Sequence, residues 1–124
     1  MRAGELAAGA PLEIVSETEA AIVADGCFGY GPVQCHRIIE KLVLKARGQG
    51  IACATVRNCG HVGRLGAWVE RLAEQGLAAM MTVTDNGVLR CVAPPDGITP
   101  CVSTNPLAIS VPTGGEPLTL DIST

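Results

Sequence analysis

Helix-forming segments and short apolar runs alternate between residues 32 and 83, and this alternation limits the possible folds more than any other feature. Apolar side chains recur at spacings of three and four through residues 32–47, as on one face of an amphipathic helix. Pro32 suits the first position of that helix. Gly48 and Gly50 end the periodic pattern. We therefore expect a helix over residues 32–47.

The alternation continues beyond this helix. The apolar run over residues 51–56 predicts a buried strand, the pattern over residues 62–75 predicts a second helix that Gly76 ends, and residues 77–83 predict another strand. A strand, a helix and a strand in this order imply parallel pairing of the two strands through a right-handed crossover. Because aromatic residues are limited to Phe28, Tyr30 and Trp68, small aliphatic side chains must fill the core.

The flanking segments complete an α/β fold with a mixed sheet, which we expect to form one domain over residues 1–124, partial at both ends. Thr113-Gly114-Gly115 lies between two apolar runs and predicts a hairpin. The remaining elements that we expect are strands over residues 12–15, 20–24, 107–111 and 118–122, a turn over residues 25–31 and an irregular segment over residues 84–97.

Charge and hydropathy exclude two classes of partner. The net charge is −3 and the basic residues are scattered, which argues against a nucleic-acid partner. No apolar run has the length of a membrane span, and no cationic leader precedes an apolar stretch, so we expect no membrane partner and a cytoplasmic location.

The six cysteines allow two interpretations. They contain no C-x-x-C pair, and nothing indicates a secreted chain, which favours free thiols that pack as small apolar groups. Cys59-Gly60-His61 comes closest to the spacing of metal ligands, but no second ligand pair with zinc-finger spacing accompanies it. We therefore expect no metal, with a small zinc domain as the alternative.

His61 is the strongest catalytic candidate, because it follows a predicted strand at the place where active sites form on parallel sheets. A histidine exchanges protons near neutral pH, as general acid-base catalysis requires. Arg64 would suit a substrate carboxylate, and a solvated arginine is the alternative. His61 could equally cap the following helix. Glycines follow the pattern G-x-x-G-x-x-G here, which is not a dinucleotide fingerprint.

Three stretches together resemble the malate/L-lactate dehydrogenase family. Residues 57–66, which read RNCGHVGRLG, resemble the family's RNSxHxGxxG segment. Ser103-Thr104-Asn105-Pro106-Leu107-Ala108 is similar to its GTNPLA turn, although an ordinary turn could share this composition. Residues 120–124, LDIST, resemble its LDMATS strand end, and Asp25-Gly26 matches ahead of the first helix. The order and separations of these stretches also fit.

This resemblance implies an oxidoreductase that uses NAD or NADP to interconvert a 2-hydroxy or imino acid and its 2-keto partner. It implies a fold that is not a Rossmann fold and a homodimer with shared active sites. His61 matches the proton acceptor. The residues implied to contact the cofactor are Asp85, Asp121, Ile122 and Ser123, and those implied to lie by the substrate are Asn58, Arg64, Thr104 and Asn105.

The family's Ser-His-Gly element and its C-terminal half have no counterpart in these residues. We therefore expect the chain to be the central third of a longer protein, with little activity alone. A non-catalytic relative that acts as a dimerisation or interaction module is the alternative. Neither the substrate nor the choice between NAD and NADP follows from the sequence.

Overall fold

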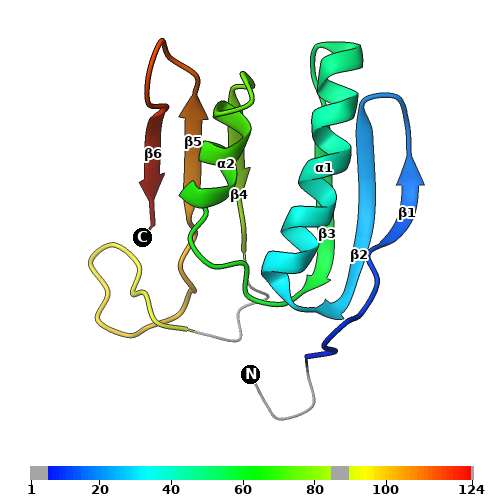
Figure 1. Cartoon of the computed structure of the whole chain (residues 1–124). Coiled ribbons are helices and arrows are strands. Elements are labelled where there is room, and N and C mark those ends of the chain that lie inside the picture. The colour runs from blue at the N-terminus through cyan, green and yellow to red at the C-terminus, as the bar shows by residue number, and fades with distance from the viewer. Residues whose placement is uncertain (1–5, 85–89, 124) are drawn as a thin grey trace. The chain divides into compact units, whose positions relative to one another are not determined.

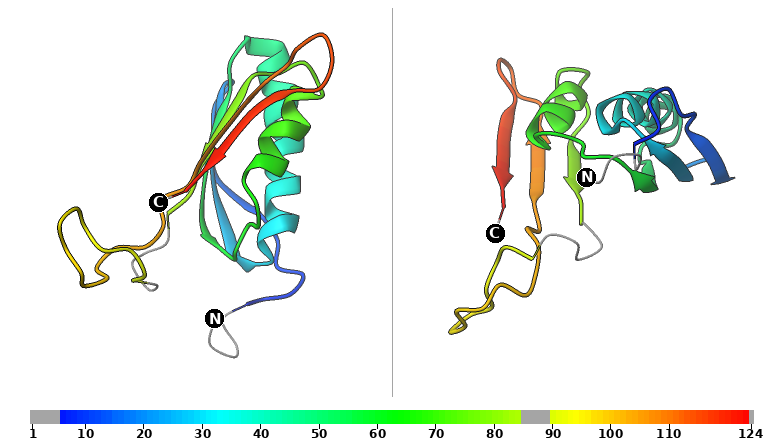
Figure 2. Two further views of the ribbon diagram at one scale, coloured as in Figure 1. Left: turned by 90° about the vertical axis from the view of Figure 1, so that its left-hand side faces the viewer. Right: turned by 90° about the horizontal axis from the view of Figure 1, so that it is seen from below.

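The computed structural model describes residues 6–84 and 90–123. The chain divides into two compact units, residues 1–64 and residues 65–124. In each unit one helix packs on a small sheet, as Figures 1 and 2 show. The α/β class is confirmed, and the single domain stays a prediction. Asp85, an expected cofactor contact, lies outside the described residues.

The first unit is a three-stranded sheet with one helix on it. Its central strand pairs antiparallel with the first strand and parallel with the third. The helix packs on the two parallel strands. The elements are β1 (Glu13–Glu17), β2 (Ala21–Gly29), α1 (Gly31–Gln49) and β3 (Cys53–Cys59).

The helix expected over residues 32–47 is confirmed as α1. Proline stands in its first turn, and Gly50 ends it with a left-handed φ of 79°, donating its N–H to Ala46 O. The side chains of Cys35, Ile38 and Ile39 are buried, as their spacing predicted. They form the core with Ile22 and Ala24, which point to the same side of β2 because alternate residues of a strand share a face.

The turn expected over residues 25–31 is largely wrong, because β2 runs through it to Gly29. Cys27 and Phe28 have φ values of 50° and 56°. They form an irregularity at which the pairing with β3 moves from Asp25↔Arg57 directly to Gly29↔Cys59. A bulge of this kind can have the amino-acid composition of a turn although the strand continues through it. The strand β3 likewise extends beyond the expected residues 51–56, to Cys59.

The second unit has an antiparallel sheet in the order β4-β5-β6. The helix packs on all three strands. The hairpin expected over residues 107–122 is confirmed, and Thr113 supports its turn by accepting a hydrogen bond from Gly115 N and donating one to Glu116 O. The elements are α2 (Gly66–Ala73), β4 (Ala79–Thr82), β5 (Leu107–Val111) and β6 (Leu118–Ile122).

One expectation for this region is wrong. The helix begins at Gly66 rather than at residue 62, because Gly63 has a φ of 79° that no right-handed helix tolerates. The parallel pairing expected between the strands on either side of α2 would join the two units and stays a prediction. Within the first unit, β2 and β3 pair in parallel on either side of α1.

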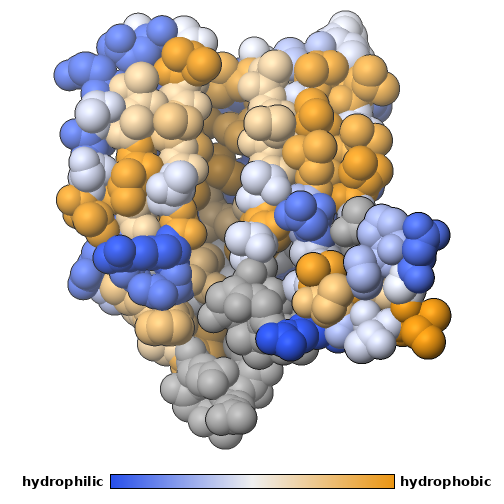
Figure 3. Space-filling view, turned by 180° about the vertical axis from the view of Figure 1, so that it is seen from behind, coloured by the Kyte–Doolittle hydropathy of each residue, from blue (hydrophilic) through white to orange (hydrophobic). Residues whose placement is uncertain are grey.

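The face of the second sheet opposite α2 is apolar. Strand alternation places Met80 of β4, Ile109 of β5 and Leu120 of β6 side by side on it. Figure 3 shows apolar side chains over β5 and β6 on this face. Leu118 and Ile122 are also exposed. None of the helices in the described ranges combines the length and apolar character that crossing a membrane requires.

Candidate functional site

His61 lies in the loop that follows β3, and backbone packing holds this loop against the end of β2. Gly60 N donates to Gly29 O at 3.0 Å. A Cβ atom added at Gly31 would overlap the carbonyl groups of Gly60 and His61, so only glycine fits there. The glycines of β2 and α1 therefore let the loop that carries His61 approach closely, which explains why this stretch has the composition of a turn.

The imidazole of His61 is exposed. Its Nδ1 accepts a hydrogen bond from Gly63 N at 3.1 Å. In the neutral ring this bond places the proton on Nε2. Nε2 has no partner among residues 6–84 and 90–123. The ring can therefore meet a ligand through Nε2.

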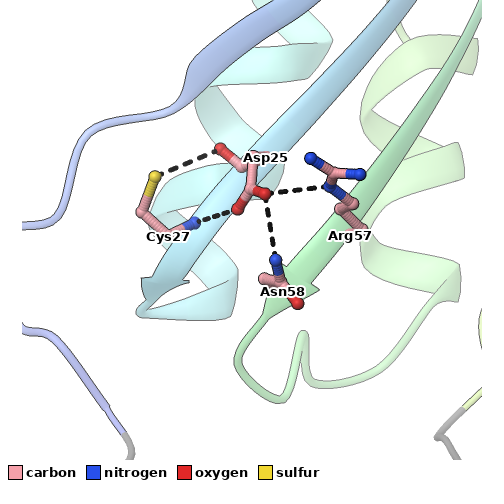
Figure 4. Close-up of polar contacts among 4 residues, drawn as sticks. All are labelled: Asp25, Cys27, Arg57 and Asn58. Carbon is pink, nitrogen blue, oxygen red and sulfur yellow. Dashed lines mark hydrogen bonds and ion pairs between the residues drawn. The ribbon is translucent and has the colours of Figure 1, made fainter.

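Asp25 is a hydrogen-bonding centre at the end of the two parallel strands (Figure 4). Its Oδ2 accepts from Arg57 Nε and from Asn58 Nδ2, each at 2.9 Å, and its Oδ1 accepts from Cys27 N at 2.9 Å. The backbone bond from Cys27 and then the bond from the Arg57 guanidinium hold the pKa of Asp25 below its ordinary value. From the sequence, Asp25 was noted only as part of the Asp25-Gly26 match. An acidic residue on one strand opposite an arginine on the neighbouring strand would have indicated the ion pair.

A cavity of about 390 Å³ in the second unit brings together residues from separate predicted stretches. Asn105 comes from the turn before β5, and Ile122 and Ser123 come from the end of β6. Thr82 and Leu107 complete the lining. Sequence reasoning missed these two, although register would have indicated them, since Thr82, Leu107 and Ile122 are aligned across the three strands.

The turn before β5 is held by Thr82, which donates from Oγ1 to Pro106 O at 3.0 Å. Asp121 points to the other face of β6, because neighbouring residues of a strand alternate. Its Oδ2 accepts the N–H of Gly66 at the start of α2 at 2.8 Å. Asp121 therefore does not line the cavity with Ile122 and Ser123. Thr104 and Arg64 are both exposed.

All six cysteines are free, and they are less uniformly buried than small apolar groups would be. Cys35 is buried, Cys27 and Cys59 are half-buried, and Cys53, Cys91 and Cys101 are exposed. In the part of the chain that the structure describes, no three residues of the metal-binding types gather into one group.

Comparison with known proteins gives one consistent result. The sequence profile described as malate/L-lactate dehydrogenase matches residues 1–124. A malate dehydrogenase of Pyrococcus abyssi is 34% identical over 113 residues, which are 91% of this chain and 30% of that protein. A Delta(1)-pyrroline-2-carboxylate/Delta(1)-piperideine-2-carboxylate reductase of Pseudomonas syringae is 35% identical over 118 residues, 94% of this chain and 34% of that protein.

The structure of malate dehydrogenase from Pyrococcus horikoshii superimposes with a TM-score of 0.81 at 30% identity, covering 90% of this chain and 31% of that one. The chain thus spans about a third of the length of the relatives that it matches, as its sequence suggested. The match over all its residues shows that the chain belongs to the malate/L-lactate dehydrogenase family.

Proposed function

We propose that the protein is an NAD- or NADP-dependent oxidoreductase that interconverts a 2-hydroxy acid and its 2-keto acid, with His61 as proton acceptor and donor. The observation that carries this proposal is the placement of His61. Its loop is fixed at the carboxyl end of a parallel strand, and its Nε2 is open to a ligand. Relatives named malate dehydrogenase and pyrroline-2-carboxylate reductase support the reaction class.

The hydrogen bond from Gly63 decides which form of the ring meets the substrate. With the proton on Nε2, the neutral ring can donate a hydrogen bond to a keto oxygen and orient it. Proton transfer in either direction needs a proton on Nδ1 as well. In oxidation the lone pair of Nε2 takes the hydroxyl proton and gives the imidazolium, and in reduction the imidazolium returns this proton to the keto oxygen. Gly63 N must therefore release Nδ1 during turnover in both directions.

The cavity of the second unit fits a nicotinamide ring in its chemistry. Leu107 and Ile122 supply apolar surface, while Thr82, Asn105 and Ser123 supply polar atoms that can orient an amide. A bound nicotinamide would donate or accept the hydride. We propose that Ile122 and Ser123 hold it, with Asp85 as a further contact, and that Asp121, which points to the other face of β6, contacts a part of the cofactor other than this ring. The sequence lacks the glycine pattern with which a Rossmann fold binds the pyrophosphate of the cofactor. We therefore propose that the cofactor binds to a fold of another type.

For the substrate, we propose contacts from Asn58, Arg64, Thr104 and Asn105. Arg64 is exposed and offers a fork of donors to a carboxylate. Asn58 donates one hydrogen bond from Nδ2 to Asp25 Oδ2, and its Oδ1 can accept a bond from a hydroxyl. We further propose that the protein acts in the cytoplasm as a homodimer.

The test is a His61→Gln substitution in the native protein, expressed with all of the chain that its gene encodes. Turnover of NADH or NADPH with pyruvate-like acids should fall by ~10²–10⁴ while cofactor binding changes little. His36→Gln is the control, because His36 lies on α1 and pairs with Glu40. Unchanged turnover in His61→Gln would remove the proposed base. A native protein that binds the cofactor but turns over no such acid would favour the non-catalytic alternative.

A further inference from the structure

The backbone that leads to His61 passes through an unfavourable conformation. Asn58 has a φ of 50°, in the left-handed region that residues other than glycine rarely adopt. Asparagine tolerates this region when its short side chain finds a local partner. Here that partner is Asp25, whose Oδ2 accepts from Asn58 Nδ2. The conformation that turns the chain out of β3 therefore depends on a side chain of β2.

The side chain of Asp25 is itself held firmly in place. Both of its oxygens are engaged, and its side chain is 15% exposed, whereas that of Arg57 is 67% exposed. The guanidinium group of Arg57 is exposed to water, whereas hydrogen-bond donors from β2 and β3 surround the carboxylate of Asp25. The bond from Cys27 N fixes the carboxylate to the bulge of β2. The end of β3 is thus tied to an element that α1 holds in place.

From this geometry we infer that Asp25 is a positioning residue for the catalytic loop: by holding Arg57 and Asn58 it sets where Gly60 and His61 leave β3. This inference rests on the proposed role of His61. We assign Asp25 no contact with the substrate, because Cys27, Arg57 and Asn58 engage both of its carboxylate oxygens. Loss of its bonds would free Asn58 to leave the left-handed region. The contacts of Gly60 with Gly29 and of His61 with Gly31 would then loosen.

The test compares Asp25→Asn with Asp25→Glu and Glu17→Gln in the native protein. Asparagine keeps the size but turns donor groups toward Arg57 and Asn58, whereas glutamate keeps the charge. Glu17→Gln is the matched control, because it removes another carboxylate of this unit that pairs with a basic side chain, Lys45 at 2.9 Å, away from the loop. The first readout is hydrogen exchange of the Gly60 amide, which reports the bond to Gly29 whether or not the protein turns over substrate.

In Asp25→Asn we expect this amide to exchange about tenfold faster or more, and kcat to fall by about 10–100-fold with cofactor affinity unchanged. Asp25→Glu should restore part of both, and Glu17→Gln should change neither. Exchange at Gly60 equal in Asp25→Asn and the native protein would overturn the inference. If Asp25→Asn does not fold, Asn58→Gly, which removes the amide bond but tolerates the left-handed φ, must give the faster exchange, and native-like exchange in that variant would equally overturn it.

The two proposals fail separately. Faster exchange in Asp25→Asn together with full turnover in His61→Gln would leave the positioning role intact and remove the base. Loss of turnover in His61→Gln together with native exchange in Asp25→Asn would do the reverse.

Discussion

The carboxylate of Asp121 on β6 accepts the backbone N–H of Gly66, the first residue of α2, at 2.8 Å. The residue before the helix, Leu65, has no side chain that could accept this bond. Asp121, a strand residue 55 positions after Gly66, takes that role. Asp121 therefore has a structural function in addition to the cofactor contact that we propose.

Asp121→Ala should destabilise the protein. It leaves an N–H at the start of α2 without its acceptor and removes a negative charge from the positive end of the helix, at a cost of about 0.5–2 kcal/mol. Urea unfolding measures the change in the free energy of unfolding. Glu116→Gln, at an exposed carboxylate in the β5-β6 turn, is the control and should be neutral. An equal effect of both substitutions would contradict the capping role.

Two glycines of α1 should respond in opposite directions to the same change. Gly31→Ala places a Cβ atom against the carbonyl groups of Gly60 and His61, so stability and turnover should both fall. Gly48→Ala meets no atom within 4 Å in the last turns of the helix, and should stabilise the protein by about 0.5–1 kcal/mol. Thermal unfolding of both variants tests this. A neutral Gly31→Ala would show that the loop does not pack on α1 as described.

Acidification should lower the stability of the first unit, because it protonates two carboxylates that accept hydrogen bonds in the folded state. Donors from Cys27 and Arg57 lower the pKa of Asp25, and the hydrogen bond from Lys45 lowers the pKa of Glu17. Because the folded-state values lie below the unfolded ones, this stability is present above pH ~4 and is lost as the pH falls through the folded-state pKa values.

Urea midpoints measured from pH 7 to pH 2 test this expectation. Asp25→Asn and Glu17→Gln should each be less stable than the native protein at pH 7 and should each lose less stability on acidification. A variant that retains the full acid sensitivity of the native protein would show that its carboxylate is not one of the groups responsible.

The cysteines should differ in reactivity. Burial, with a smaller contribution from nearby Cys59, raises the pKa of the Cys35 thiol to about 12 from an ordinary 9.0. At pH 8 its thiolate fraction is then about a thousandfold lower than that of an ordinary thiol. Iodoacetamide should modify the exposed Cys53, Cys91 and Cys101 first and leave Cys35 intact until the protein unfolds. Peptide mass spectrometry follows each site, and early labelling of Cys35 would contradict its burial.

Local patterns predicted the elements whose neighbours in sequence are also their neighbours in space. The helix α1 follows from its apolar spacing and its terminal glycine, and the β5-β6 hairpin follows from two apolar runs around a glycine turn. Of the proposed site residues, His61 was found from its place after a strand. Asp25 was not assigned a role, because its partners Arg57 and Asn58 are more than thirty residues away.

The sequence by itself determined the α/β class, the elements α1, β5 and β6, and, through three motifs in order, the family. Only the tertiary structure decided that β2 continues through a glycine-rich bulge, that β4 pairs antiparallel with β5, and that Thr82 lies beside Asn105 and Ile122. The reason is physical. Periodicity and terminal residues act within a few positions of the chain, whereas strand pairing and the enclosure of a carboxylate depend on groups that meet only after folding.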